Sequence, residues 1–341
     1  MRSITGTIGV PGFTSIIGQN LTIRILQNFL EKGTVPHAML FGGPAGVGKR
    51  TTARLFAMAL NCLDTEAEVE KPCTRCRACR QMLGGQHPDL LLIEPKGAVL
   101  RINQIRELLA VLAMKPFQAR HRVVIIAQAD AMNPEAGNAL LKVLEEPPAD
   151  TVLILTTEKP PDLLPTIVSR CRHLRFNPLS VQDISALLAA HRDVPGPEAE
   201  TVASMSSGSL SRALQLIDMN WQDRRRWLIQ AAGLDEPPVH GRQGNTAALS
   251  LAAILAGQKE MIHDSLDLLK TWIRDLAVVD QIPGQVVNQD CLERLQRVSR
   301  GIDPKKLNSL WQIVEKTQKA IAANANVRLT LDNMALSMRS L

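Results

Sequence analysis

Gly43-Pro44-Ala45-Gly46-Val47-Gly48-Lys49 fits the pattern G-x-x-x-x-G-K, in which backbone N–H groups and a lysine surround the phosphates of a nucleotide. An apolar segment that is typical of a buried strand, residues 37–41, comes before this loop. A segment with helical periodicity, from residue 48 to about residue 61, comes after it. The order of strand, loop and helix is the context in which such a pattern holds phosphate. We therefore expect a nucleotide-binding α/β domain around this loop.

The residues that follow the loop do not suit hydrolysis of a nucleotide. Arg50 stands where a working loop has serine or threonine, whose hydroxyl binds the Mg²⁺ between the phosphates, and a guanidinium has no lone pair to offer a metal. The strand expected at residues 122–126 runs into Ala127 and Gln128, where a hydrolase has an aspartate and a general base. The sequence therefore predicts an NTPase fold that has lost hydrolysis.

Alternating strand and helix patterns continue beyond the loop. Further strands are expected at residues 90–93 and 152–156, and helices at about 103–114 and 134–146. This alternation is typical of a parallel sheet with helices on both faces. After residue 178 the strand patterns fade and helical patterns remain. We expect three domains, which are a P-loop α/β domain over residues 1–178, a small helical lid domain over residues 179–219 and an all-helical domain over residues 220–341.

Four of the six cysteines lie close together in the sequence, with the spacing C-x10-C-x2-C-x2-C. They are Cys62, Cys73, Cys76 and Cys79. Four thiolates are the ligands of a closed, structural Zn²⁺ site, and the two-residue gaps let successive sulfurs face one ion. Disulfides would need an oxidising compartment, and free thiols left by a decayed site are the other alternative. We expect a structural zinc module over residues 62–79, inserted between a helix and the next strand.

Composition and charge describe an ordinary soluble globular protein, with 45% hydrophobic and 21% charged residues in a chain of 341. The net charge of +6 is not gathered into a polybasic arm, and the chain has no Tyr, so platforms for stacking single-stranded bases are scarce. Arg75, Arg77 and Arg80 and the arginine run at residues 224–226 are interpreted as solvated basic faces. No apolar run is long enough for a membrane span, so we expect a cytoplasmic protein without a membrane partner.

Taken together, these features resemble the clamp-loader branch of the AAA+ proteins, and the resemblance covers essentially the whole chain. Besides the loop and the cysteines, it rests on residues 13–19 (FTSIIGQ), 115–117 (KPF), 138–148 (NALLKVLEEPP), 169–171 (SRC) and 324–329 (NANVRL). The segments 138–148 and 169–171 are highly specific to this family, and their order and spacing fit it. The resemblance implies an AAA+ P-loop domain with a zinc insert, a helical lid domain and a C-terminal collar domain through which subunits assemble.

The resemblance gives Arg170 a catalytic role. In the family, the serine-arginine-cysteine motif presents an arginine finger to ATP in the neighbouring subunit, where the guanidinium neutralises charge that grows on the γ-phosphate. A surface salt bridge is the alternative for this residue. Whether the loop of this chain binds ATP or ADP is left open. The residues that the resemblance places around such a nucleotide are Gly43, Gly46, Gly48, Lys49, Arg50, Thr51 and Thr157.

Two departures from the family's ATPase members bear on activity. Where the motor subunits carry Asp-Glu, this sequence has Ala127 and Gln128, and the nearby Asp130 is displaced by three positions. Where they carry a nucleotide-sensing arginine, this sequence has Ser211, and Arg212 follows it. Both departures favour a chain that does not hydrolyse ATP.

The resemblance implies a non-hydrolysing subunit of the replicative DNA polymerase III clamp loader, with no ATPase activity of its own. Its partners would be ATPase subunits of the gamma/tau type and a delta-type subunit, and, through the assembled complex, the sliding clamp and primed DNA. One rival is an active ATPase subunit of the gamma type, in which Thr51 or Thr52 supplies the hydroxyl and Asp130 or another carboxylate holds the metal. A second rival is a zinc-dependent nucleic-acid-binding module, in which Arg75 and Arg77 contact DNA.

Overall fold

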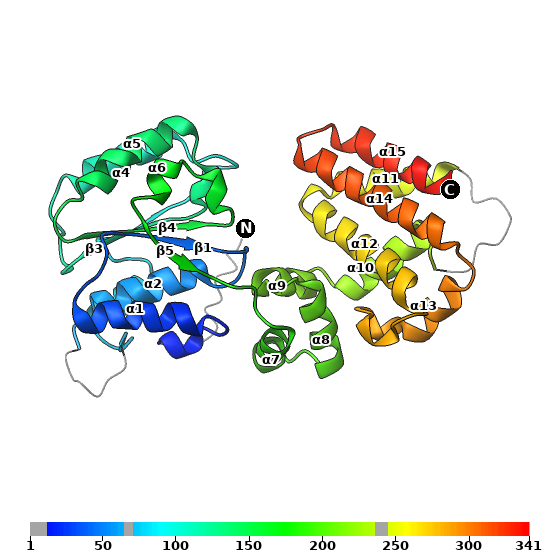
Figure 1. Cartoon of the computed structure of the whole chain (residues 1–341), viewed down its shortest axis with the longest axis horizontal. Coiled ribbons are helices and arrows are strands. Elements are labelled where there is room, and N and C mark those ends of the chain that lie inside the picture. Colours follow the sequence, from blue (N-terminus) through cyan, green and yellow to red (C-terminus); the bar gives the residue numbers. More distant parts are fainter. Residues whose placement is uncertain (1–11, 65–70, 236–244, 341) are drawn as a thin grey trace. The chain divides into compact units, whose positions relative to one another are not determined.

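The structure is a computed structural model that describes residues 12–64, 71–235 and 245–340 (Figure 1). The chain divides into two compact units. Unit 1 comprises residues 1–183 and 208–211, and unit 2 comprises residues 184–207 and 212–341. Among the residues described, no helix is both long enough and apolar enough to cross a membrane.

Unit 1 is built on a parallel five-stranded sheet with the strand order β2-β3-β4-β1-β5. The strands are β1 (Ala38–Gly42), β2 (Leu90–Ile93), β3 (Arg122–Ile126), β4 (Thr151–Thr157) and β5 (Arg172–Arg175). Every residue of β3 and β4 is buried, which explains why their sequences are largely apolar instead of alternating between polar and apolar. The predicted parallel α/β sheet is therefore confirmed.

Helices cover both faces of this sheet (Figure 1). One face carries α1 (Asn20–Lys32) and α2 (Lys49–Leu60), and the other carries α4 (Ile102–Leu112), α5 (Pro134–Glu145) and α6 (Pro165–Val168). Successive side chains of a strand point to opposite faces, so β1 contributes to two apolar cores. Met39 and Phe41 pack in the core that includes Phe56 of α2, whereas Leu40 packs in the core that includes Leu140 of α5.

A buried ion pair fixes the loop that leads into β3. The Asp89 carboxylate is 0% exposed and accepts the backbone N–H groups of residues 117–119 at 2.7–2.9 Å. Arg122 contacts Asp89 at 3.2 Å and donates to the carbonyl oxygens of Val111, Met114 and Lys115. Burial by itself raises the pKa of Asp89, but these hydrogen bonds outweigh it and hold the pKa below its ordinary value.

We expect Asp89→Asn to lower the free energy of unfolding by about 3–5 kcal/mol, because it leaves the buried Arg122 guanidinium without its counter-charge. The pKa of Asp89 is lowered in the folded protein, so the carboxylate stabilises the fold above its ordinary pKa of 3.8. This contribution disappears as the pH falls through the lower, folded value. Urea unfolding near neutral pH and in acid measures both effects. Asp162→Asn, at an exposed carboxylate, is the control, and an equal effect of the two substitutions would contradict the role of the pair.

Unit 2 contains helices and no strand in the residues that the structure describes. Its helices, of which α7 and α9 begin in unit 1, are α7 (Val181–Arg192), α8 (Gly196–Met205), α9 (Leu210–Asp218), α10 (Trp221–Ala231), α11 (Asn245–Gly257), α12 (Ile262–Val278), α13 (Leu292–Ser299), α14 (Pro304–Ala322) and α15 (Val327–Arg339). Helix α11 packs on α15, and α12 packs on α14. The loss of strand patterns after residue 178 therefore predicts the observed helical architecture correctly.

The arginine run at residues 224–226 is not uniformly solvated. Arg225 is only 6% exposed, donates to Asn288 Oδ1 at 2.6 Å and forms an ion pair with Asp290. The side chain of Arg226, by contrast, is 69% exposed. The prediction of a solvated face is wrong for Arg225, because its partners lie 63 and 65 positions away and no local pattern announces them.

Candidate functional site

The phosphate loop joins the carboxyl end of β1 to the first turn of α2. Gly46 and Gly48 have φ angles of 70° and 95°, in the left-handed region that favours glycine. Gly43 lies so close to the backbone carbonyl of Phe176 that a Cβ atom there would overlap it. The shape of the loop therefore requires these glycines even before any ligand is considered.

The side chain of Lys49 is folded onto its own loop. Its Nζ atom donates to the carbonyl oxygens of Gly43 and Pro44, at 2.5 and 2.6 Å. The residue is 9% exposed, and burial lowers its pKa, an effect that the negative charges of Glu158 and Asp130 partly offset. A phosphate group would have to replace the two carbonyl oxygens as the partner of the ammonium group.

The turn that begins α9 contacts the phosphate loop within unit 1. The backbone N–H of Leu210 donates to the Gly46 carbonyl at 3.2 Å. A Cβ atom on Gly46 would collide with the side chains of Ser209 and Ser211. Ser211 therefore faces the loop with a short, uncharged side chain at the position where the resemblance expects a nucleotide-sensing arginine.

Arg212, the residue after Ser211, is engaged within unit 2. It forms an ion pair with Asp267 of α12. Asp267 also accepts a hydrogen bond from Gln318 Nε2 at 2.6 Å. The guanidinium of Arg212 is thus held by a residue of unit 2.

The residues after Lys49 do not present the usual metal ligand. Arg50 forms an ion pair with Glu94 at 2.5 Å, and the two side chains are 48% and 45% exposed. Thr52 is buried, and its hydroxyl donates to the Gly48 carbonyl at 2.9 Å, one turn back along α2. Thr51 is exposed. In the described part of the chain, no hydrogen bond ties the Thr51 hydroxyl to the helix backbone, in contrast to that of Thr52.

Thr157 ends β4 beside the phosphate loop. Its carbonyl oxygen accepts the backbone N–H of Gly43 at 3.2 Å, which ties the loop to the sheet. Its hydroxyl oxygen accepts the N–H of Lys159 at 3.1 Å, and the residue is 1% exposed. The structure thus brings the loop glycines, Lys49 and Thr157 together at the carboxyl ends of β1 and β4.

Two carboxylates act on Lys49 from the ends of neighbouring strands. Asp130 follows β3, and one of its oxygens, Oδ1, is buried with no hydrogen-bond partner among the residues that the structure describes. The sequence interpretation discounts it as a metal ligand because its position is displaced, and its negative charge raises the pKa of Lys49 against the larger effect of burial. Glu158 directly follows β4 and was not singled out from the sequence. The available signal was its place after a strand, since the carboxyl ends of parallel strands meet at one edge of a sheet.

Arg170 lies in the turn between α6 and β5. Its Nη1 atom donates to the Thr166 carbonyl at 3.0 Å, and its Nη2 atom contacts the Glu145 carboxylate at 2.6 Å. Its remaining hydrogen-bond partner among the described residues is the hydroxyl of Ser169, at 3.5 Å. The side chain is 35% exposed. The guanidinium is therefore held by groups outside the phosphate loop and remains accessible to solvent.

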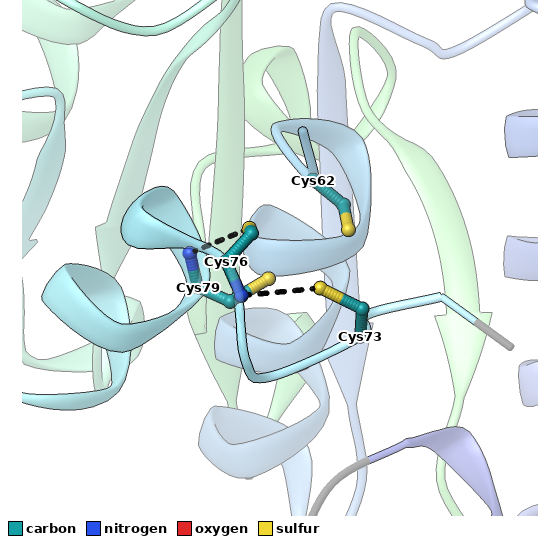
Figure 2. Close-up of side chains that lie close together, drawn as sticks. All are labelled: Cys62, Cys73, Cys76 and Cys79. Carbon is teal, nitrogen blue, oxygen red and sulfur yellow. Dashed lines mark hydrogen bonds between the residues drawn. The ribbon is translucent and has the colours of Figure 1, made fainter. Parts of the chain in front are cut away.

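The four cysteines of the predicted module converge on one point, as Figure 2 shows. Cys62 follows α2, Cys76 precedes α3 (Arg77–Leu83), and Cys79 lies within that helix. The Sγ atoms of these three residues and of Cys73 all lie within 4.8 Å of one another. The prediction that four sulfurs gather at one place is confirmed, and the cluster could hold a metal ion.

Hydrogen bonds and burial give Cys76 and Cys79 different thiol pKa values. Cys76 Sγ accepts the N–H of Cys79, and Cys73 Sγ accepts the N–H of Cys76, both at 3.4 Å. Burial raises the pKa of the Cys76 thiol, but the N–H groups of Cys79 and Leu63 outweigh it and lower the pKa to about 7. Burial and the neighbouring sulfurs raise the pKa of Cys79. A divalent cation would relieve the repulsion that keeps several adjacent sulfurs from ionising together.

Comparison with known proteins finds family matches that together cover most of the chain. Residues 18–180 match the family described as DNA polymerase III, delta subunit, and residues 220–339 match the family described as DNA polymerase III, delta subunit, C terminal. DNA polymerase III subunit delta' of Bacillus subtilis is 31% identical over 327 residues, which make up 94% of this chain and 96% of that protein.

Two further relatives match a smaller part of the chain. DNA polymerase III subunit delta' of Pseudomonas aeruginosa is 36% identical over 197 residues, or 57% of this chain and 60% of that protein. DNA polymerase III subunit tau of Bacillus subtilis is 34% identical over 211 residues, or 60% of this chain and 37% of that protein. Because two family matches span both units and a delta' subunit aligns over nearly the full length of both proteins, the chain belongs to the family of DNA polymerase III delta-prime subunits.

Proposed function

We propose that this chain is a non-hydrolysing subunit of the replicative DNA polymerase III clamp loader, which supplies Arg170 in trans to ATP held by a neighbouring ATPase subunit. The observation that carries the proposal is the contrast between two places in unit 1. Beside the phosphate loop, Arg50 pairs with Glu94, and Ala127 and Gln128 follow β3, so the usual metal ligands are missing. Away from the loop, Arg170 offers a held and accessible guanidinium. Such a chain is suited to stabilise the transition state of another subunit.

The proposal assigns a role to each domain and names the partners. Residues 1–178 form the AAA+ domain that carries Arg170, residues 179–219 form the lid, and residues 220–341 form a collar through which subunits assemble. The partners are ATPase subunits of the gamma/tau type and a delta-type subunit in the cytoplasm. Through the assembled complex they bring the chain to the sliding clamp and primed DNA. Family membership and the similarity to subunits named delta' and tau support this assignment.

We also propose that the cysteine cluster binds a structural Zn²⁺ ion. Four sulfur ligands suit zinc, and a closed set leaves no open position for a catalytic water. In the described part of the segment between α2 and β2, α3 is the one helix, so a metal ion would stabilise a segment with little regular structure of its own. Arg75, which the rival DNA-binding role would use, pairs with Asp64 at 3.0 Å, and its side chain is 66% exposed.

The isolated chain is expected to show no ATP turnover above background with Mg²⁺, and Lys49→Ala is expected to leave that result unchanged. The reason is the missing hydroxyl at Arg50 and the missing carboxylate at Ala127. The measurement is phosphate release, with an ATPase subunit of the gamma/tau type as the positive control. Turnover that Lys49→Ala abolishes would instead favour an active ATPase, in which Thr51 and Asp130 serve the metal.

A further inference from the structure

We propose that Glu145 is a positioning residue for Arg170, whose carboxylate holds the guanidinium in the orientation in which it meets an anionic oxygen of a neighbouring molecule. The inference rests on the proposed role of Arg170 in trans and adds a second residue to it. Glu145 is the last residue of α5 and belongs to the specific segment 138–148. Neither the phosphate loop nor the cysteine cluster uses this segment.

The guanidinium of Arg170 is held on two sides and open on the rest. Nη2 contacts Glu145 Oε1 at 2.6 Å, and Nη1 contacts the Thr166 carbonyl at 3.0 Å and the Ser169 hydroxyl at 3.5 Å. A guanidinium has five N–H donors, so these three contacts leave donors available. The exposed fraction of the side chain, 35%, gives them access to an incoming group. A charge-stabilising group works best when its orientation is set before its partner arrives.

Folding stability does not explain why Glu145 stands where it does. An acidic residue at the C-terminal end of a helix is disfavoured, because it meets the negative end of the helix dipole. Glu146 follows directly, so two carboxylates stand at this end of α5. The ion pair with Arg170 is exposed, with 35% and 51% of the two side chains accessible, and pairs of this kind contribute little to stability. The remaining effect of the Glu145 carboxylate is to orient the Arg170 guanidinium.

The experiment uses the reconstituted clamp loader with its ATPase subunits, the sliding clamp and primed DNA. Glu145→Ala is expected to lower the kcat of DNA-dependent ATP turnover by about threefold to tenfold and to leave the KM for ATP unchanged. Without the Glu145 carboxylate, the Arg170 side chain samples more rotamers, and it must lose this freedom when it contacts the phosphate. Glu145→Gln keeps a hydrogen-bond acceptor, so its kcat is expected to lie between that of Glu145→Ala and that of the unmodified complex. Glu146→Gln removes the same charge one position away and is the matched control, with unchanged kcat.

A second comparison shows whether Glu145 acts through Arg170. In a complex that already carries Arg170→Ala, the further change Glu145→Ala is expected to cost no more turnover, because the two residues form one unit. A further loss there, or a raised kcat for Glu145→Ala alone, would overturn the proposal. Unchanged kcat for Glu145→Ala together with slow turnover for Arg170→Ala would leave the finger in place and remove the positioning role. Unchanged turnover for Arg170→Ala would instead remove the proposed function itself.

Discussion

A clamp loader that carries Arg170→Ala in this chain is expected to hydrolyse ATP about 10³-fold or more slowly at the site that the Arg170 guanidinium reaches. The γ-phosphoryl group gains charge on its oxygens in the transition state, and alanine leaves this charge without a partner. The effect should fall on kcat more than on the KM for ATP, since the charge develops after binding. Single-turnover measurement of the reconstituted complex, with clamp and primed DNA present, isolates the hydrolysis step.

Two further variants show whether the loss belongs to the finger. Arg172→Ala removes a charge two positions away, from an exposed residue of β5, and is expected to leave turnover unchanged. Arg170→Lys keeps the charge but not the planar fork of donors, so turnover should recover only in part. Unchanged turnover with Arg170→Ala would reduce the residue to the other interpretation, a surface ion pair with Glu145.

If the cysteine cluster binds zinc as proposed, loss of the metal is expected to have the largest effect on stability. Structural zinc sites contribute on the order of 10 kcal/mol, so Cys76→Ser or a strong chelator should unfold the module, including α3. Among the described residues, the core that contains Leu40, Val124 and Leu140 is formed without the module, so we expect β1 and β3 to persist. Hydrogen exchange should therefore show amides of residues 73–83 losing protection while those of β1 and β3 keep it. The zinc content should fall from one ion per chain.

Cys171→Ser is the control for this experiment, because Cys171 is outside the cluster of four sulfurs. Burial raises the pKa of the Cys171 thiol to about 11, so this residue stays protonated at neutral pH. We expect its replacement to change neither the zinc content nor the protection of the module. Zinc-free protein that nevertheless keeps protected amides at residues 73–83 would contradict a structural metal.

The arginines of this chain show the limit of prediction from sequence. The arginine run at residues 224–226 predicts a solvated face, and the side chain of Arg226 is indeed exposed. The side chain of Arg225 is not, because α10 turns it toward Asn288 and Asp290, residues far away in the chain.

Four of the five strands, the phosphate loop and the gathering of the four cysteines follow from the order of residues alone, because each is encoded within a short segment, whereas the strand order β2-β3-β4-β1-β5 is set by packing. Apolar runs specify buried strands, glycines allow the left-handed backbone of the loop, and two-residue gaps bring sulfurs together. The pairing of Asp89 with Arg122, 33 positions apart, and of Glu145 with Arg170, 25 positions apart, needs the folded chain. Periodicity indicates which face of an element is buried, but packing determines which distant side chain it meets there.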